Sequence, residues 1–290
     1  MLKNKSYILF SHVIKAQPYN MPFLDACLSN NIRLFDYETI RSTPQNGGQR
    51  LVAFGKFAGL AGMIDMLRGL GERLLSLGYS TPFMSVSSSY MYPDLPTAKA
   101  AVQRCGDEIK RLGTGLPADM PPLRFIFTGT GNVAGGALEI FNLLPVKWVT
   151  PQELSTLPPD PFTVYGCVVQ AKDMVQRKDG GAFDKKEYYD SPQLYRPTFH
   201  ETVAPHMSVL VNCMYWDVRF PRLLTNTQTK ELEATYKDQK KRTFLGLADI
   251  TCDIQGSVEF LKRHCTIDQP FFMYDPTKDS VQSSIGMFCR

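Results

Sequence analysis

Blocks of apolar and polar residues along the chain predict strands that are followed by helices. The apolar run "YILF", residues 7–10, is typical of a short strand, and residues 21–30 carry apolar side chains at helical spacing. A second strand is predicted for "IRLFDYE", residues 32–38, and the polar, glycine-containing residues 41–50 are typical of a loop. The chain therefore begins with a strand, a helix and another strand.

A long helix rich in glycine and alanine is predicted from Leu51 to about residue 78, and an amphipathic helix over residues 97–111. Gly55, Gly59 and Gly62 recur in the first of these at steps of three and four residues. Each glycine lowers helix stability, so their alignment on one face predicts that another backbone packs very closely there.

The most informative segment is "LRFIFTGTGNVAGGALEIFNLLP", residues 123–145, in which an apolar strand runs into a glycine turn and then a helix. Gly129 allows a tight turn, and Gly131 lets a pyrophosphate approach the backbone. The helix that begins at about Asn132 and Val133 presents free N–H groups and a partial positive charge to an anion. The segment predicts a dinucleotide-binding turn.

This turn departs from the full G-x-G-x-x-G pattern, because Ala134 occupies the third position. Alanine is an accepted substitute, and we expect Gly135 and Gly136 to keep the helix close to the sheet. A tight strand-to-helix turn without any ligand is the alternative. The strand before the turn and the helix after it favour dinucleotide binding.

Further strands are predicted for "FTVYGCVV", "MSVLVNCMYW" and "FLGLADITCDI". Their alternation with helices predicts an α/β fold with a largely parallel sheet that is covered on both faces. Residues 176–196 are charged and rich in glycine and tyrosine, and we expect them to form an exposed excursion.

The strand after the glycine turn bears on the choice of nicotinamide cofactor. A carboxylate at its end would bind the 2′-hydroxyl of NAD, but "VKWVT" ends in Thr150, and Glu153 lies beyond Pro151. This leaves room for a 2′-phosphate, with Lys147 nearby. The sequence favours NADPH over NADH, and a Glu153 that turns back to serve NADH is the alternative.

Composition excludes several classes of protein. Of 290 residues, 43% are hydrophobic and 21% charged, as in globular proteins, and the 32 basic and 28 acidic residues are scattered, so we expect no nucleic-acid partner. Charged residues interrupt the apolar stretch of residues 51–77, so we expect no membrane span. The seven cysteines are dispersed without a C-x-x-C pair, which indicates reduced thiols and no metal site.

Four motifs, in order, carry a resemblance to a known family: "FSHVIKAQ", "RLFDYE", "RLVAFGKFAGLAGM" and "FTGTGNVAGGA". From about Ser6 to the end, the sequence resembles the lysine-ketoglutarate reductase domain of the bifunctional alpha-aminoadipic semialdehyde synthase. More distantly it is similar to lysine-forming saccharopine dehydrogenases and to the alanine dehydrogenase and transhydrogenase group. The resemblance implies an oxidoreductase of lysine degradation that joins L-lysine to 2-oxoglutarate and reduces the imine to saccharopine.

The resemblance also implies roles for individual residues. His12 matches the family's catalytic histidine, a proton donor and acceptor, and Glu38 matches an acidic residue that tunes the charge of the site. Lys15 matches a lysine near the site, with a solvated loop cation as the alternative. Arg50 matches an arginine that pairs with a substrate carboxylate, a task suited to a guanidinium.

Two further residues are implied on the cofactor side. Gln17 matches a position near the cofactor. Asp253, which we place at the end of a strand in "ITCDIQGS", matches an aspartate beside the cofactor cleft. The carboxyl ends of strands are where open α/β sheets bind their ligands.

The expected architecture is two Rossmann-like lobes with a cleft between them. Residues 1–50, joined by the returning residues 261–290, would form a partial substrate lobe, and residues 51–260 a complete NAD(P)-binding lobe. Family members carry a preceding stretch with a second catalytic lysine, so we expect a fragment or a divergent short form. In longer members a saccharopine-cleaving domain follows.

Other functions stay open at this point. The chain could be a catalytically inactive dinucleotide-binding or interaction module of the same fold, or an alanine-dehydrogenase-like amino-acid dehydrogenase. The "FGKFAGLAGM" and "FDYE" motifs favour the saccharopine group over the latter. The resemblance implies a mitochondrial location, with a cytoplasmic one as the alternative.

Overall fold

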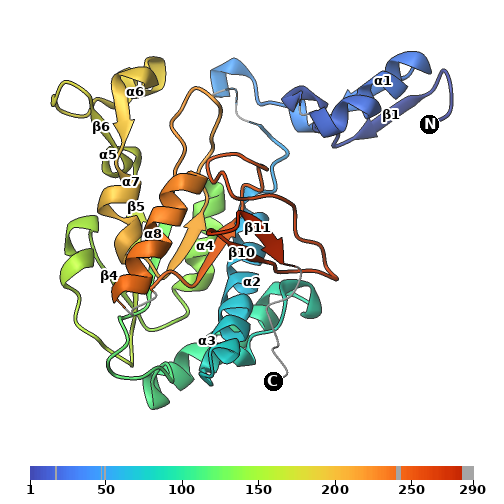
Figure 1. Ribbon diagram of the computed structural model, residues 1–290. Helices are drawn as coiled ribbons and strands as arrows, with labels where there is room; N and C mark the ends of the chain where they lie inside the picture. The colour runs from blue at the N-terminus through green and yellow to red at the C-terminus, as the bar shows by residue number, and fades with distance from the viewer. Residues whose placement is uncertain (17, 47, 49, 240–242, 283–290) are drawn as a thin grey trace. The chain divides into compact units, whose positions relative to one another are not determined.

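A computed structural model describes residues 1–16, 18–46, 48, 50–239 and 243–282, and the chain divides into two compact units, residues 1–54 and 55–290 (Figure 1). The division falls slightly beyond the expected boundary at residue 50. Residues 261–282 pack in the second unit, where we expected them to return to the first. Their place is explained by Gly69, whose missing side chain makes room for the ring of Phe271, and by Arg68, whose guanidinium lies 5.9 Å from that ring.

The first unit is built on a small parallel sheet. The strands β1 (Ser6–Leu9) and β2 (Arg33–Asp36) pair in parallel, with Leu9 opposite Asp36. The helix α1 (Met21–Ser29) connects them, as the apolar spacing predicted. Short 3₁₀ helices complete the unit: η1 (Val13–Lys15), η2 (Pro18–Asn20), η3 (Tyr37–Thr39) and η4 (Pro44–Asn46).

The second unit is built on a five-stranded parallel sheet with the strand order β4-β5-β3-β8-β9. Every residue of β3 and β8 is buried, as expected for the centre of a parallel sheet with both faces covered. This confirms the predicted α/β fold class. The strands are β3 (Arg124–Thr128), β4 (Val146–Trp148), β5 (Val164–Val169), β8 (Val209–Asn212) and β9 (Gly246–Asp249).

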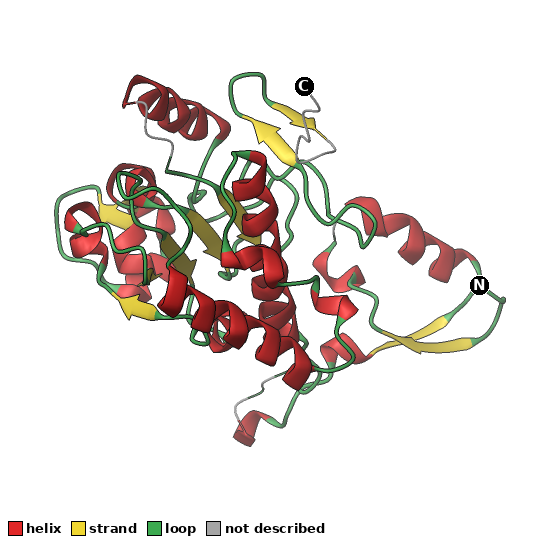
Figure 2. Ribbon diagram, turned by 90° about the horizontal axis from the view of Figure 1, so that it is seen from below, coloured by secondary structure: helices red, strands yellow, loops and turns green. Residues whose placement is uncertain are grey.

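Helices lie on both faces of this sheet (Figure 2). Successive side chains of β3 point to opposite faces, so Phe125 and Phe127 join one apolar core and Ile126 the other. The first core is covered by α2 (Gly55–Ser76), α3 (Leu95–Leu112) and α4 (Asn132–Phe141). The second is covered by α5 (Ala171–Met174), α7 (Phe199–Thr202) and α8 (Asn226–Gln239).

The helices α2 and α4 pack backbone against backbone. A Cβ atom at Gly59 would lie 2.0 Å from the carbonyl oxygen of Val133, and one at Gly136 would lie 2.1 Å from that of Lys56. The predicted close approach of another backbone is confirmed at Gly59, where the partner is α4, whereas Gly62 meets the side chain of Ile250. The expectation that Gly135 and Gly136 face the sheet is wrong, because Gly136 faces α2 and no atom lies within 4 Å of a Cβ at Gly135.

The expected exposed excursion over residues 176–196 is confirmed for most of its residues, but the segment has secondary structure of its own and two buried tyrosines. The strands β6 (Val175–Arg177) and β7 (Tyr195–Pro197) pair antiparallel and flank the helix α6 (Lys185–Asp190). Tyr188 and Tyr195 are buried in the second core, since a tyrosine can bury its ring once its hydroxyl finds a partner. The hydroxyl of Tyr195 donates to Glu187 at 2.6 Å.

The remaining elements are short. The strands β10 (Met273–Asp275) and β11 (Ser280–Gln282) form an antiparallel pair. Over the described ranges, none of the helices combines the length and the apolar character that crossing a bilayer requires. The other 3₁₀ helices are η5 (Pro82–Ser85), η6 (Ser89–Met91), η7 (Pro151–Thr156), η8 (Pro192–Leu194) and η9 (Ala204–His206).

Candidate functional site

The first candidate site lies where the two strands of the first unit end. Because β1 and β2 are parallel and Leu9 lies opposite Asp36, both strands end at the same edge of the sheet. His12 follows β1 in the left-handed backbone conformation, with φ at 57°, and precedes η1. Residues other than glycine seldom adopt this conformation, and where they do the surrounding structure has to impose it.

Asp36 joins the two strand ends. Its carboxylate accepts hydrogen bonds from the hydroxyl of Ser11 at 2.5 Å and from the N–H of Glu38 at 2.9 Å. Burial would raise the pKa of Asp36, but these hydrogen bonds outweigh it and lower the pKa below its usual value. Asp36 therefore stays ionised, and its hydrogen bond to the N–H of Glu38 fixes the backbone at Glu38.

The side chain of Glu38 is the centre of the cluster. It is 3% exposed, with one carboxylate oxygen 2.8 Å from Nδ1 of His12 and the other 3.3 Å from Nη2 of Arg50. A buried carboxylate requires such partners, because an unpaired buried charge is strongly destabilising. Nδ1 of His12 is buried while the side chain as a whole is 39% exposed, so the exposed part of the ring lies away from Glu38.

The aromatic ring of Phe10 lies behind this cluster. It packs edge-on against His12 at 4.6 Å between ring centroids, and the guanidinium of Arg50 lies 5.8 Å from its centroid. Phe54 and Tyr37 pack against the same ring at 5.4 and 5.6 Å. An apolar wall of this kind strengthens charge interactions beside it, because it keeps water from one side of them.

The structure thus brings together three residues that the sequence singled out, namely His12, Glu38 and Arg50. The backbone of Lys15 ends η1, and its side chain lies outside the described part of the structure. Gln17 also lies outside the described residues. Sequence reasoning did not include Phe10 and Asp36 in the site, although each lies two positions before a residue that it did single out, His12 and Glu38.

The second candidate site is the glycine turn after β3. Gly129 has φ at 86°, its N–H donates to the carbonyl of Val169 at 3.4 Å, and a Cβ there would lie 3.1 Å from the carbonyl oxygen of Cys213. Gly131 differs, because its φ is −86° and no atom lies within 4 Å of a Cβ built on it. The fold requires glycine at 129, whereas at 131 it leaves open space beside the backbone.

The helix α4 starts directly at this open space. Its first residues, Asn132 and Val133, precede the first helical hydrogen bond, which runs from the N–H of Gly135 to the carbonyl of Gly131 at 2.9 Å. The N–H groups of the first helical turn have no acceptor within a helix and bind anions well. The open space at Gly131 and these N–H groups fit the pyrophosphate of a dinucleotide.

A buried polar network lies at the carboxyl ends of three neighbouring strands, next to the glycine turn. Thr128 donates to the side-chain oxygen of Asn212 at 2.7 Å, and the Asn212 amide donates to Asp249 at 3.0 Å and to Ser257 at 2.9 Å. Burial raises the pKa of Asp249, although hydrogen bonds from Thr251 and Asn212 partly offset this. The sequence contained one signal for this network, namely a polar residue at the end of each of the three apolar strands.

Asp253 lies beyond β9 and not at its end. The strand stops at Asp249, and the chain then turns through Cys252, whose N–H donates to the carbonyl of Asp249 at 3.3 Å and whose φ is 55°. The backbone carbonyl of Asp253 accepts from the N–H of Gly256 at 2.8 Å. This turn ends the strand earlier than the apolar pattern predicted.

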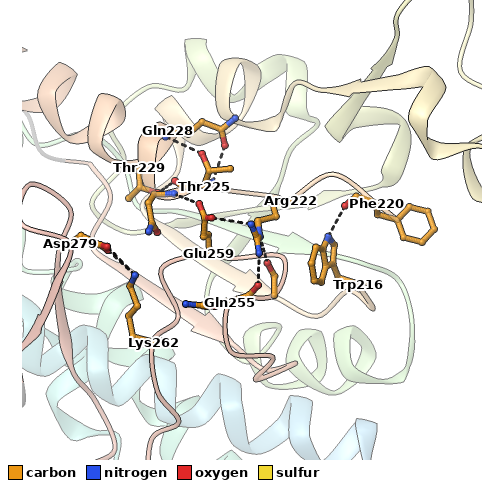
Figure 3. A network of polar contacts seen from close by, with 12 residues as sticks. Trp216, Phe220, Arg222, Thr225, Gln228, Thr229, Gln255, Glu259, Lys262 and Asp279 are labelled. Carbon is orange, nitrogen blue, oxygen red and sulfur yellow. Dashed lines mark hydrogen bonds and ion pairs between the residues drawn. The ribbon is translucent and has the colours of Figure 1, made fainter. Parts of the chain in front are cut away.

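Arg222 holds the loop that follows Asp253, and Figure 3 shows its contacts with Gln255 and Glu259. Its guanidinium donates to the carbonyls of Gly256 and Gln255 at 3.0 and 2.9 Å and pairs with Glu259 at 2.9 Å. Glu259 in turn accepts from the N–H of Asn226 at 2.8 Å. The loop is therefore anchored on one side by Arg222 and on the other by the buried network through Ser257.

Metal ligands are not grouped within the described ranges: no three histidine, cysteine, aspartate or glutamate side chains there are arranged to hold an ion. The residues brought together at the two sites are of the types that support proton transfer, carboxylate binding and pyrophosphate binding.

Comparison with known proteins gives two kinds of match, and no family model matches the chain. A solved L-alanine dehydrogenase is 15% identical with a TM-score of 0.38, covering 92% of this chain and 55% of that one. Alpha-aminoadipic semialdehyde synthase of Arabidopsis thaliana is 47% identical over 306 residues, and the mitochondrial synthase of Mus musculus is 40% identical over 304. Both matches cover 100% of this chain but only 28% and 32% of those proteins. The chain is thus similar along its whole length to one part of the alpha-aminoadipic semialdehyde synthases, which confirms the resemblance drawn from its motifs.

Proposed function

We propose that the chain is a saccharopine-forming reductase, which condenses L-lysine with 2-oxoglutarate and reduces the resulting imine with a nicotinamide dinucleotide. The observation that carries this proposal is the buried carboxylate of Glu38 between His12 and Arg50. The similarity to alpha-aminoadipic semialdehyde synthases supports it.

In this proposal His12 moves the protons. The lysine amine must be neutral to attack the keto carbon, and the carbinolamine oxygen must gain a proton to leave as water. An imidazole suits both steps, because its ordinary pKa lies near neutrality. Glu38 lies 2.8 Å from Nδ1, a charge contact that does not have hydrogen-bond geometry in the structure, and the exposed part of the ring is left to exchange protons with the substrate.

Arg50 binds a carboxylate of 2-oxoglutarate or saccharopine in the same proposal. A guanidinium carries five N–H donors, and the contact with Glu38 at 3.3 Å uses only Nη2. The side chain is 35% exposed, so the remaining donors can reach a ligand. Lys15 is proposed to lie near the substrate, as the resemblance implies.

The cofactor-binding residues follow from the glycine turn. The backbone around Gly129 and Gly131 and the first N–H groups of α4, at Asn132 and Val133, would bind the pyrophosphate of NADPH or NADH. When bound, the cofactor supplies the hydride that reduces the imine. Gln17 and Asp253 stay proposed cofactor residues on the resemblance alone.

NADPH is the proposed cofactor, with NADH less favoured. The alternative in which Glu153 serves NADH loses support, because the Glu153 carboxylate accepts from the N–H and the hydroxyl of Thr150 at 2.7 and 2.8 Å. These hydrogen bonds lower the pKa of Glu153 and hold its carboxylate against Thr150.

The decisive experiment mixes the purified chain with L-lysine, 2-oxoglutarate and NADPH and follows the nicotinamide absorbance. We expect a loss of absorbance that requires both substrates, with saccharopine as the product detected by mass spectrometry. Omitting lysine is the control for unspecific oxidation. Absorbance loss with pyruvate and ammonia instead would favour the alanine-dehydrogenase-like alternative.

A second candidate is a cofactor-binding module without turnover. The chain spans 28% of the Arabidopsis relative and 32% of the mouse relative, so residues needed for turnover can be supplied from elsewhere in such proteins. Cofactor binding without absorbance loss would support this candidate. A saccharopine-cleaving partner domain and a mitochondrial location are proposed from the same relatives.

A further inference from the structure

The order of strands in the sheet changes which residues lie next to the glycine turn. In dinucleotide-binding folds, the residue that meets the adenosine ribose stands at the carboxyl end of the strand beside the glycine strand. Along the chain, the strand after the glycine turn is β4. In the sheet, however, β5 lies between β4 and β3, so on that side the strand paired with the glycine strand is β5 and not β4; on the other side it is β8.

The pairing register separates Lys147 from the turn. Lys147 lies opposite Tyr165 of β5, and Tyr165 lies opposite Arg124, the first residue of β3. From Arg124 to Gly129 the strand advances about five residues, or roughly 16 Å along the sheet. Lys147 also stands over the ring of Tyr165, with Nζ 6.0 Å from its centroid. It therefore points to the wrong part of the sheet for a ribose phosphate.

The end of β5 lies beside the turn instead. Val169, its last residue, pairs with Thr128, and the carbonyl of Val169 accepts from the N–H of Gly129 at 3.4 Å. The next residues are Gln170 and the short helix α5, which contains the exposed Lys172. The first side chains beyond the edge on this side of the turn therefore come from residues 170–173.

The acidic residue in this stretch is held by a local hydrogen bond. Oδ2 of Asp173 accepts from the N–H of Gln170 at 2.9 Å, and the two residues form a capping box. This oxygen is already occupied within its own turn. Lys172 supplies the charge that a phosphate requires, since a lysine ammonium binds phosphate as a point charge.

We propose that Lys172, at the carboxyl end of β5, binds the 2′-phosphate of NADPH and thereby determines the choice of cofactor. The inference rests on the proposed function for the presence of a dinucleotide. Lys147 was expected near the 2′-phosphate because β4 follows the glycine turn along the chain. Lys172 takes that role here because β5 lies beside β3 in the sheet.

The test measures binding and not turnover. NADPH and NADH are titrated against the wild-type chain and the variants Lys172→Ala and Lys147→Ala, with nicotinamide fluorescence as the readout. We expect Lys172→Ala to weaken NADPH binding about tenfold, the usual effect of losing one charge-assisted hydrogen bond, and to change NADH binding less than about twofold. Lys147→Ala is the matched control and should change neither.

A competition experiment isolates the phosphate itself. Adenosine 2′,5′-bisphosphate and 5′-AMP are used to displace NADPH, and Lys172→Ala should weaken only the first. Equal losses for both nucleotides, unchanged NADPH binding in Lys172→Ala, a loss in Lys147→Ala instead, or tighter binding of NADH than of NADPH to the wild type would each overturn the inference.

The two proposals fail in different ways. If Lys172→Ala shows the selective loss but the wild type gives no saccharopine, the assignment of Lys172 stands and the reductase proposal fails. If saccharopine forms and Lys172→Ala leaves the preference for NADPH unchanged, the reductase proposal stands and the assignment of Lys172 fails. If neither dinucleotide binds, both are wrong. Because Lys172 is exposed, the melting temperature of its variant should match the wild type.

Discussion

The two candidate sites are built from different parts of the polypeptide. The glycine turn of the second unit is made of backbone, and it follows a strand whose residues are all buried. The cluster of the first unit is made of side chains around Glu38, next to a two-stranded sheet. In that sheet, Ile8 and Phe35 lie opposite each other and are 73% and 52% exposed.

This difference separates stability from chemistry. Where backbone atoms are in contact, as between α2 and α4, an added methyl group would overlap a carbonyl oxygen. The helices would have to move apart, which lowers the stability of the fold. Where half-exposed side chains such as His12 and Arg50 surround one buried carboxylate, their removal should change the chemistry more than the fold. Substitutions should therefore act on unfolding in the second unit and on turnover in the first.

The largest expected effect comes from removing the imidazole of the first site. If the reductase proposal holds, His12→Ala should lower kcat by roughly 10²- to 10⁴-fold, the usual contribution of a general acid or base. The free energy of unfolding should change much less than kcat, because the side chain is 39% exposed and Arg50 still pairs with the buried Glu38. Steady-state kinetics and urea unfolding measure the two quantities.

His200→Ala serves as the control for this experiment, since His200 lies in the second unit and contacts Glu201 at 3.6 Å. It should leave kcat unchanged. Unchanged turnover in His12→Ala would remove His12 from the mechanism. A large loss of stability in that variant would instead contradict the contrast between the two units.

The next effect tests the contact between α2 and α4 with neighbouring glycines. Gly136→Ala should lower the free energy of unfolding by about 1–3 kcal/mol, because its Cβ would lie 2.1 Å from the carbonyl oxygen of Lys56. Gly135→Ala should raise it by about 0.5–1 kcal/mol, because it gains helix propensity and meets no atom within 4 Å. Urea denaturation of both variants measures these changes. If the two variants lost the same free energy of unfolding, α2 and α4 would not be in close contact at Gly136.

Within the glycine turn, two substitutions should separate ligand binding from folding. Gly131→Ala should weaken dinucleotide binding about tenfold without lowering the melting temperature, because its Cβ occupies only the open space beside the turn. Gly129→Ala should lower stability by about 1–2 kcal/mol, because φ is 86° there. Fluorescence titration and thermal melts distinguish them, and unaltered binding in Gly131→Ala would exclude that space as the pyrophosphate site.

The smallest effect concerns the pH dependence of stability near the buried network. Burial raises the pKa of Asp249 in the folded state, so the folded chain holds this proton more tightly than the unfolded chain. This tighter binding stabilises the folded chain at pH values below the ordinary pKa of about 3.9. The stabilisation is lost as the pH rises through the higher pKa of the folded state.

Asp249→Asn removes this titration and keeps an oxygen that can accept from Asn212. The stability of the variant relative to the wild type should therefore increase as the pH is raised from about 4 to 7. Urea unfolding at several pH values measures the difference. A difference that is constant across this range would mean that Asp249 does not titrate with a raised pKa.

Local patterns were sufficient for most elements of the central sheet. Apolar runs bounded by glycine and polar residues predicted β3, β5 and β8, and the spacing of glycines in α2 predicted a close backbone contact. For residues 176–196 the composition predicted the exposure of most side chains but gave no signal for two buried tyrosines. Tyr188 and Tyr195 bury their rings in the second core.

The candidate sites were predicted unevenly for a related reason. The glycine turn is contiguous in sequence, and its conformation follows from residues within a few positions of one another. The Glu38 cluster joins residues from three separate segments, and only the family resemblance indicated them beforehand. The network of Thr128, Asn212 and Asp249 was missed because each residue by itself is an unremarkable polar strand end.

The sequence by itself determined the α/β class, the strand, turn and helix around Gly129, and the residue types available for chemistry. These depend on periodicity and on short-range backbone preferences. Only the tertiary structure decided that α4 packs on Gly59 of α2, that Glu38 lies between His12 and Arg50, and that β5 rather than β4 pairs with β3. Such pairings join residues far apart in the chain, and long-range packing energy selects among arrangements that local patterns permit equally.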